Sequence, residues 1–236
     1  MKNFAVRERE VEDMFNGIAP SYDLLNHLLS FGIDKLWRRR LVKGVAKQNP
    51  AIVLDVATGT SDLAIALACR SKSVAIVGVD IAEEMLARGS QKLIKRNLSD
   101  RITLQRASSL SLPFNSSYFD AAMVAFGVRN FEDPLKGLTE IGRVIKPGGT
   151  ISVLEFTTPK FAVIRWAYLF YFNQVLPWIG QKISGHKTAY TYLPTSVDAF
   201  KERDEFVELL VKAGFTDTSY SLQSFGIAAI YRAKKL

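Results

Sequence analysis

The stretch from Leu54 to Asp62, LDVATGTSD, decides the fold, because it joins the end of an apolar strand to the start of a helix. A glycine in such a turn lets the backbone approach a ligand, and free amides at the helix start favour polar or anionic groups. A dinucleotide fold would show GxGxxG here. Instead Gly59 is followed by Thr60 and Ser61, so the pyrophosphate-binding fingerprint is absent. The turn predicts a nucleotide-like ligand.

A second acidic position lies in VGVDIAEEML, where Asp80 ends the next hydrophobic strand 21 positions after Gly59. A carboxylate there can accept both hydroxyls of a ribose, as an acid about 20 residues downstream does in nucleotide-binding βαβ units. The competing interpretation is a helix cap, because Asp80 also precedes the acidic first turn at Glu83 and Glu84. Strand and spacing together favour the ribose role.

Short β-branched runs alternate with helical patterns from residue 50 onward, which predicts an α/β fold with a mostly parallel sheet. The expected strands are Ile52–Val56, Val74–Asp80, Ile102–Arg106, Ala121–Phe126 and Thr150–Phe156. The expected helices between them are Leu63–Arg70, Glu83–Asn97 and Pro134–Ile145, the last capped by Asp133 and closed by Pro147-Gly148-Gly149.

Both ends of the chain depart from this alternation. A helix around Asp204–Ala213 precedes two closely linked strands, Phe215–Leu222 and Phe225–Tyr231, which should pair antiparallel. Residues 1–49 read as a helical cap, with helices over Val6–Phe15 and Asp34–Ala46 and an irregular Pro20–Gly32 between them. We expect one domain over residues 1–236.

Composition limits the partners. The formal net charge of +8 favours an anionic partner such as a nucleic acid, a phospholipid surface or a phosphorylated ligand. The single cysteine, Cys69, excludes an internal disulfide, and we expect it to pack in the core. Only His27 and His186 are present, so no structural zinc cluster is expected. The charged N-terminus is neither a signal peptide nor a spanning helix, and we expect a cytoplasmic protein.

Four separated segments sharpen the prediction. They are MFNGIAPSYDLLNHLLSFGIDKLWRR, AFGVRNFEDPLKGL, RVIKPGGTISVLEF and AYTYLPTSVDAF, and together with the cofactor turn they resemble the menaquinone and ubiquinone C-methyltransferase family over nearly the full length. The resemblance implies a class I, Rossmann-like methyltransferase with a seven-stranded sheet and an antiparallel final hairpin. It also implies S-adenosyl-L-methionine as methyl donor, no metal, and demethylmenaquinol as the substrate.

The resemblance assigns the cofactor residues one by one. Thr60 matches the threonine of the turn, Asp80 the acid that holds the ribose, and Gly59 and Asp55 belong to the same motif. Ser108 and Ser109 stand beside the adenine, where relatives commonly have an acid or asparagine followed by alanine. A serine hydroxyl can accept from the adenine amino group without a carboxylate's strength. Ser61 also departs, because glycine is usual there.

The substrate side is assigned more loosely. Arg129, just after the strand that reaches the reactive end of the sheet, would stabilise a quinol phenolate or position a water that takes its proton, and the competing interpretation is an ion pair with Glu132 or Asp133. Residues 157–200 are expected to form a substrate lid, in which the aromatic stretch Phe161–Gln181 admits the isoprenoid tail. Tyr22, His27, Phe170 and Phe172 are the expected substrate contacts.

Three hypotheses about the function stay open at this point. The first is C-methylation of a prenylated quinol, in menaquinone or ubiquinone biosynthesis, with contact at an anionic membrane surface. The second is an enzyme acting on RNA, against which there is no base-methylation tetrad or appended RNA-binding module, so no nucleic-acid partner is expected. The third is a non-catalytic protein that binds the methyl donor or a quinone. A homodimer is left open by the sequence.

Overall fold

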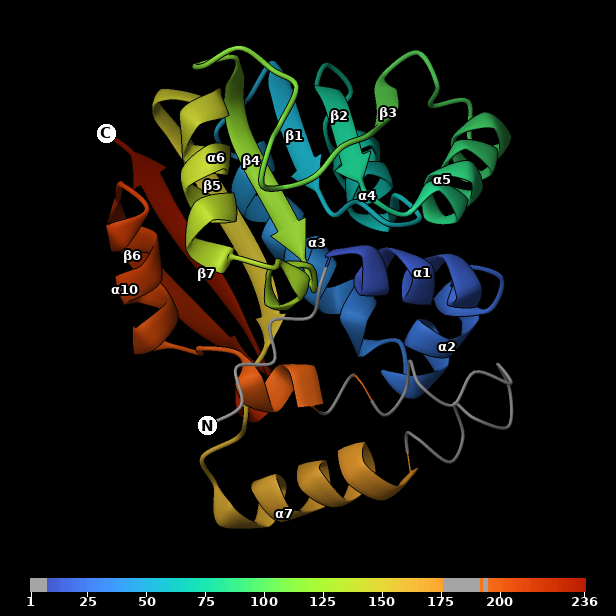
Figure 1. Cartoon of the computed structure of the whole chain (residues 1–236), viewed down its shortest axis with the longest axis vertical. Helices are drawn as coiled ribbons and strands as arrows, with labels where there is room; N and C mark the ends of the chain where they lie inside the picture. Colours follow the sequence, from blue (N-terminus) through green and yellow to red (C-terminus); the bar gives the residue numbers. More distant parts are fainter. Residues whose placement is uncertain (1–7, 176–191, 193–194) are drawn as a thin grey trace.

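A seven-stranded sheet forms the centre of the protein, with the order β3-β2-β1-β4-β5-β7-β6 (Figure 1). The computed structural model describes residues 8–175, 192 and 195–236. The first five strands in the order are parallel, and β7 pairs antiparallel with both β5 and β6. The strands are β1 Ile52–Val56, β2 Ala75–Asp80, β3 Ile102–Arg106, β4 Phe119–Ala125, β5 Ile145–Phe156, β6 Phe215–Gln223 and β7 Ala228–Lys235. The predicted class I methyltransferase sheet is confirmed.

The chain reverses its direction of travel across the sheet at β1, because β2 lies on one side of it and β4 on the other. In open sheets of this kind, ligands bind outside the carboxyl ends of the strands at such a switch point. The site should therefore lie where β1, β2 and β4 end, near Val56, Asp80 and Ala125.

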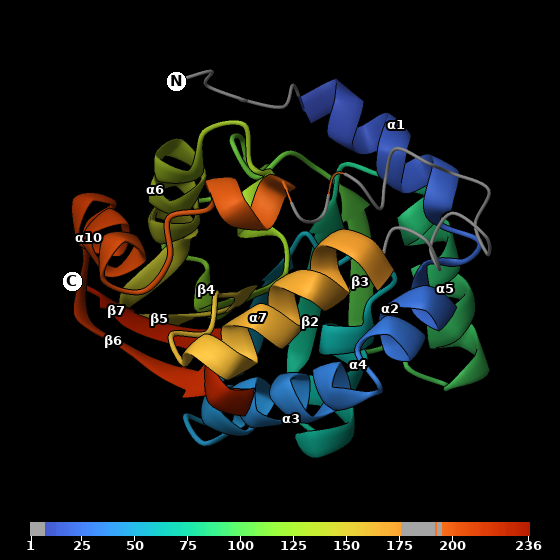
Figure 2. The same cartoon turned by 90° about the horizontal axis from the view of Figure 1, so that it is seen from below.

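Helices cover both faces of the sheet and bury two apolar cores (Figures 1 and 2). On one face Trp37, Leu41 and Leu67 pack against β1 and β4. On the other, Leu138 and Phe206 pack beside Phe119. The helices of the first face are α3 Ile33–Ala46, α4 Asp62–Arg70 and α5 Glu83–Lys95, and those of the second are α6 Pro134–Val144 and α10 Asp204–Lys212.

The N-terminal cap lies over the carboxyl ends of the parallel strands (Figure 1). It comprises α1 Glu8–Ile18 and α2 Tyr22–Leu29, followed by α3. The expectation that Pro20–Gly32 is irregular is wrong, since only a short turn with Ser21 N–H bonded to the Ile18 carbonyl separates α1 from α2. Tyr22 packs against Phe15 and Ile18, so tertiary packing stabilises a helix too short to be stable alone.

Three further predictions need correction. Pro147–Gly149 does not close a helix before a strand: α6 already ends at Val144, and these residues form an irregularity within β5, where the register with β4 shifts. The final strand begins at Ala228 rather than Phe225, because Phe225 takes a positive φ within a short helical turn. Cys69 is exposed rather than core. The cap of α6 is confirmed, since Asp133 accepts the Lys136 N–H at 3.0 Å.

The segment after β5 lies beyond the cap in Figure 1. Here α7, Ala162–Phe170, continues into a π-helical turn, Tyr171–Val175. Tyr168 is the buried residue of α7 and packs beside Ile18 and Val197, whereas Trp166 and Phe170 are exposed. The described helices include none long and apolar enough to cross a membrane. The later part of the expected lid, residues 176–191, lies outside the described residues.

Candidate functional site

The turn that follows β1 is held by contacts to its neighbours. Gly59 has φ +55° and no heavy atom within 4 Å of where a Cβ would stand, so the turn leaves open space beside it. The Gly59 N–H donates to Asp80 Oδ2 at 2.8 Å, and the Ala82 N–H donates to Asp80 Oδ1 at 2.9 Å. Burial raises the pKa of Asp80, while these amides act to lower it. Asp80 thus joins the ends of β1 and β2, and its predicted ribose role stays a prediction.

A pocket opens at this switch point, and concave sites in this position of such sheets are where small molecules usually bind. Gly59, Asp80 and Ser109 line it, and Phe126 follows β4 on its far side. Four residues of the N-terminal cap complete the lining, namely Glu8, Val11, Phe15 and Tyr22. The pocket therefore offers carboxylate, backbone and apolar surfaces to one ligand.

Other predicted cofactor residues lie behind this lining. Thr60 Oγ1 donates to Asp23 Oδ1 at 2.5 Å and accepts from Lys92 at 2.8 Å. Ser108 Oγ donates to Glu8 Oε1 at 2.5 Å, so its hydroxyl is already engaged. Among the described residues, Glu8 is the pocket carboxylate that sequence reasoning missed, since only the fold brings it to Ser108. A charged residue in a cap helix gives no local signal of that position.

Asp55 supports the turn from within the core. It is 1% exposed and accepts the Thr58 hydroxyl at 2.6 Å. Burial raises its pKa to about 7 from the ordinary 3.8. It is a positioning group here and does not line the described pocket.

The buried Asp55 predicts a pH-dependent stability difference. With a folded pKa of about 7 and an ordinary pKa of 3.8, the folded chain binds the proton more tightly, so Asp55 contributes less stability as pH rises through that window. Relative to Asp55→Asn, the wild type should lose up to about 4 kcal/mol of unfolding free energy across it. Urea titrations of both proteins at several pH values measure this. Parallel curves would contradict it.

Ser61 is accommodated by a glycine on the neighbouring helix. It has φ 68°, is fully buried, and its Oγ has no hydrogen-bond partner among the described residues. A Cβ on Gly89 would stand 2.4 Å from that Oγ and 3.0 Å from Leu104 Cδ1. The small residue at 89 is therefore what makes room for serine in the cofactor turn.

This contact predicts a reversal of the usual helix preference. Alanine normally stabilises an internal helix position relative to glycine by about 1 kcal/mol. Gly89→Ala should instead cost about 1–3 kcal/mol through overpacking, and Ser61→Gly should recover most of that loss. Urea unfolding of the two single variants and the double variant measures the coupling. An equal effect of Gly89→Ala in both backgrounds would rule out the contact as its cause.

A second pocket adjoins the first. Phe15, Tyr22 and Phe126 line both, so they form the wall between them. Asp34, Arg38, Arg129, Phe156 and Tyr192 are among the groups that line the second pocket alone. Two adjoining pockets that share aromatic rings are suited to bring one ligand against another.

Arg129 lines this second pocket, and its guanidinium is fixed by a buried carboxylate and a backbone carbonyl. Its Nη1 donates to Glu155 Oε2 at 2.9 Å and to the Phe126 carbonyl at 2.5 Å. The ion-pair partner is thus Glu155, fully buried on β5, and not Glu132 or Asp133. The Arg129 Nε atom is buried and has no hydrogen-bond partner in the described part of the chain. The two contacts use only Nη1 of the five-donor guanidinium, so a group fixed in this way keeps further N–H donors.

The predicted substrate residues do not all lie at the pockets. Tyr22 lines both pockets, and burial raises the pKa of its hydroxyl, so it stays protonated. His27 lies between Asp34 and Asp62 rather than in the lining of these pockets. Phe170 is 54% exposed and stacks on Trp166 with ring centroids 5.9 Å apart. The side chain of Phe172 lies outside the described part. Arg38 is buried against Asp34.

The sequence profile of the ubiE/COQ5 methyltransferase family matches residues 3–235. The chain belongs to this family. It is 45% identical to a ubiquinone/menaquinone biosynthesis C-methyltransferase UbiE of Geobacter sulfurreducens, over all of this chain and 92% of the relative. It is 41% identical to a demethylmenaquinone methyltransferase of Bacteroides fragilis, over 99% and 95% of the two chains. The methyltransferase is thus S-adenosylmethionine-dependent, and the first pocket has the groups to hold that donor.

Solved structures support the fold alone. The methyltransferase superimposes on the [4+2]-cyclase SpnF with a TM-score of 0.70 at 19% identity, over 97% of this chain and 96% of the other. It matches a methyltransferase from Thermotoga maritima, described as a possible histamine N-methyltransferase, with a TM-score of 0.65 at 17% identity, over 95% and 99%. A cyclase among these neighbours illustrates that the fold does not fix the chemistry.

Proposed function

We propose that this methyltransferase transfers the methyl group of S-adenosylmethionine to a ring carbon of a prenylated naphthoquinol, converting demethylmenaquinol to menaquinol. The observation that carries the proposal is the second pocket, which shares Phe15, Tyr22 and Phe126 with the donor pocket and places Arg129 in the same cavity. Aromatic walls suit a planar ring, and a guanidinium suits its oxygen. The names of the relatives support the same substrate class.

Each pocket group has a defined task in this proposal. Asp80 accepts the ribose hydroxyls, while Ser109 and Glu8 offer acceptors to the adenine amino group. Arg129 donates to the quinol oxygen as negative charge develops, which makes the neighbouring ring carbon nucleophilic. Because arginine stays protonated, it stabilises the phenolate but does not remove the proton.

The equivalent benzoquinol of ubiquinone biosynthesis is the second candidate, because the Geobacter relative carries both pathways in its name. The test is radiolabelled methyl transfer into lipid extract, with one naphthoquinol and one benzoquinol assayed in parallel under anaerobic conditions. Label in the naphthoquinol supports the proposal, and label only in the benzoquinol favours the second candidate. If neither quinol gives labelled lipid, the remaining hypothesis is a non-catalytic protein that binds the donor or a quinone.

We further propose that a face of α7 and the α2–α3 turn contacts the inner surface of an anionic membrane, from which the tail enters. This outer apolar face consists of five side chains that are each at least 54% exposed, namely Phe31, Phe161, Val163, Trp166 and Phe170. The Phe31 and Tyr171 rings, 6.0 Å apart, join the turn to the end of α7. Exposed Lys35, Lys160 and Arg165 lie close in sequence to this face.

The membrane proposal predicts salt-sensitive binding to anionic vesicles. Basic side chains near such a surface contribute about 1 kcal/mol each, and burial of a large apolar side chain contributes about 1.5–3 kcal/mol. Trp166→Ser with Phe170→Ser should weaken vesicle binding at least tenfold and raise KM for a long-tailed quinol without changing donor affinity. Vesicle co-sedimentation measures this. Ile94→Ser, on α5 at another part of the surface and 68% exposed, is the matched control.

Two outcomes would overturn the membrane proposal. One is absence of vesicle binding by the wild type at low salt. The other is equal loss of activity on tailed and tailless quinols in the double variant, which would make Trp166 and Phe170 structural residues of α7.

A further inference from the structure

Seven cap residues line the second pocket at a constant spacing of four positions. Their character changes along the chain from apolar, through aromatic, to polar and charged. They are Met14, Ile18, Tyr22, Asn26, Ser30, Asp34 and Arg38. Residues four apart share one side of a helix, and the turns between α1, α2 and α3 keep this spacing. One end of the stripe therefore places ionisable groups in the cavity where the quinol is proposed to bind.

Asp34 is the centre of that charged end. It is 4% exposed, accepts the Ser30 hydroxyl on Oδ1 at 2.6 Å, and holds both His27 Nδ1, at 2.9 Å, and Arg38 on Oδ2. A carboxylate has about four acceptor positions. The three partners leave one position, on Oδ1, in a residue that lines the pocket.

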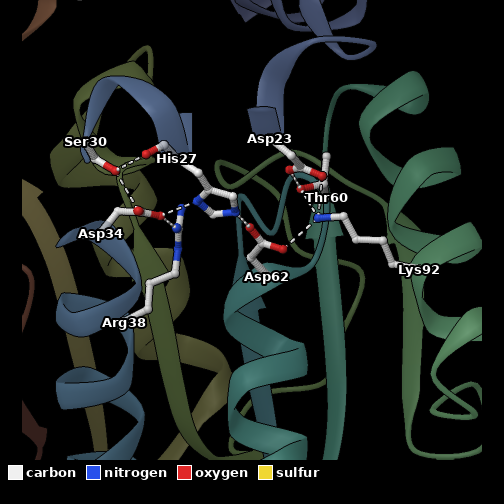
Figure 3. A network of polar contacts seen from close by, with 8 residues as sticks. All are labelled: Asp23, His27, Ser30, Asp34, Arg38, Thr60, Asp62 and Lys92. Carbon is white, nitrogen blue, oxygen red and sulfur yellow. Dashed lines mark hydrogen bonds and ion pairs between the residues drawn. The ribbon is translucent and has the colours of Figure 1, made fainter. Parts of the chain in front are cut away.

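His27 lies between Asp34 of α3 and Asp62 of α4 (Figure 3). Its Nε2 lies 3.5 Å from Asp62 Oδ2, and its side chain is 27% exposed. Burial acts to raise the pKa of Asp62, but Lys92 and Arg38 outweigh it, and the net shift is downward. Asp62 therefore stays ionised beside the imidazole. The ring has a carboxylate at each nitrogen, so it can take a proton on one side and release one on the other.

The reaction requires a proton acceptor. Methylation of the ring carbon depends on loss of a hydroxyl proton from the quinol, and neither Arg38 nor Arg129 can accept it. Tyr22 and Tyr192 have raised pKa values through burial, so they are protonated and cannot accept it either. Within the described residues, Asp34 is the carboxylate that lines this pocket.

We propose that Asp34 is the catalytic base that accepts the hydroxyl proton of the bound quinol, and that His27 is the positioning residue through which the proton leaves. This rests on the proposed function. As the O–H bond breaks toward Asp34, the ring carbon forms its bond to the methyl group and the sulfur–methyl bond breaks, leaving S-adenosylhomocysteine. The ring C–H proton then moves to the oxygen and restores the quinol. One proton is released per turnover: Asp34 passes it to His27 Nδ1 in the tautomer that carries its hydrogen on Nε2, and the ring then releases the Nε2 proton to water.

The test uses the pH dependence of turnover under anaerobic conditions. Asp34→Asn should lower kcat at pH 7 by about a hundredfold, as loss of a general base does. The deficit should shrink as pH approaches the ordinary phenol pKa of about 10, because solvent then ionises the quinol. Donor affinity by calorimetry should stay within about twofold of wild type. Asp13→Asn, an exposed carboxylate of α1 outside this pocket, is the matched control and should behave as wild type.

Because Asp34→Asn leaves buried Arg38 without its anion, His27→Gln is measured beside it. Glutamine keeps a donor toward Asp34 but cannot carry a proton, and we expect about a tenfold lower kcat that also recovers at high pH. Two results would overturn the Asp34–His27 pair while leaving the proposed function intact, provided that the wild type makes methylated quinol. One is a loss of kcat that is as large at pH 9.5 as at pH 7 in the variants, and the other is full activity in both variants. No product from the wild type overturns the proposed function and the pair with it.

Discussion

Asp80→Ala is expected to weaken S-adenosylmethionine binding at least tenfold. The carboxylate already holds the Gly59 and Ala82 amides and lines the first pocket, where the donor is proposed to bind. Its removal would cost two ribose hydrogen bonds to a charged acceptor, about 1.5–3 kcal/mol each, and a tenfold loss requires only about 1.4 kcal/mol. Titration calorimetry on the purified chain measures the dissociation constant directly.

Two controls separate ribose binding from turn structure. Asp80→Asn keeps the shape and one acceptor, so it should bind the donor with intermediate affinity. Asp100→Ala, exposed between α5 and β3, should bind like the wild type. Wild-type affinity in Asp80→Ala would remove this residue from the donor site.

The turn after β1 could be predicted from the sequence because its signals are local. Gly59 and Asp80 follow two adjacent strands, and parallel strands end at the same edge of a sheet. The hydrogen bond between them in the structure fits that expectation. The final hairpin was readable for the same reason, although positive φ at Phe225 delayed the start of β7.

The substrate side was harder to predict from the sequence, because the residues that contact one another there are distant in the chain. Sequence proximity suggested Glu132 or Asp133 for Arg129, but the partner is Glu155, whose burial within β5 no local pattern announces. Arg38 follows Trp37 in a run of three arginines, and a charge run usually marks a solvated face. Only the packing of α3 over the sheet buries Arg38 against Asp34.

The buried pair of Arg129 and Glu155 sets the design of the second experiment. Glu155 is fully buried, and removal of one partner from a buried ion pair costs about 3–5 kcal/mol. Arg129→Ala alone would therefore mix misfolding with loss of catalysis. Arg129→Gln combined with Glu155→Gln removes both charges and keeps similar volumes, and comparison with Glu155→Gln alone isolates the guanidinium.

The double variant is expected to turn over the quinol at least a hundredfold more slowly than Glu155→Gln at saturating substrate, while it melts at a similar temperature and binds S-adenosylmethionine normally. The reason is electrostatic: loss of one fixed donor to a developing oxyanion costs about 10²–10³ in kcat, and Arg129 lines the second pocket with its guanidinium held by Glu155. Radiolabelled methyl transfer under single-turnover conditions measures the chemical step apart from product release. Normal turnover in the double variant would make Arg129 a structural residue of the β4–α6 connection, and the phenolate would need another source of positive charge.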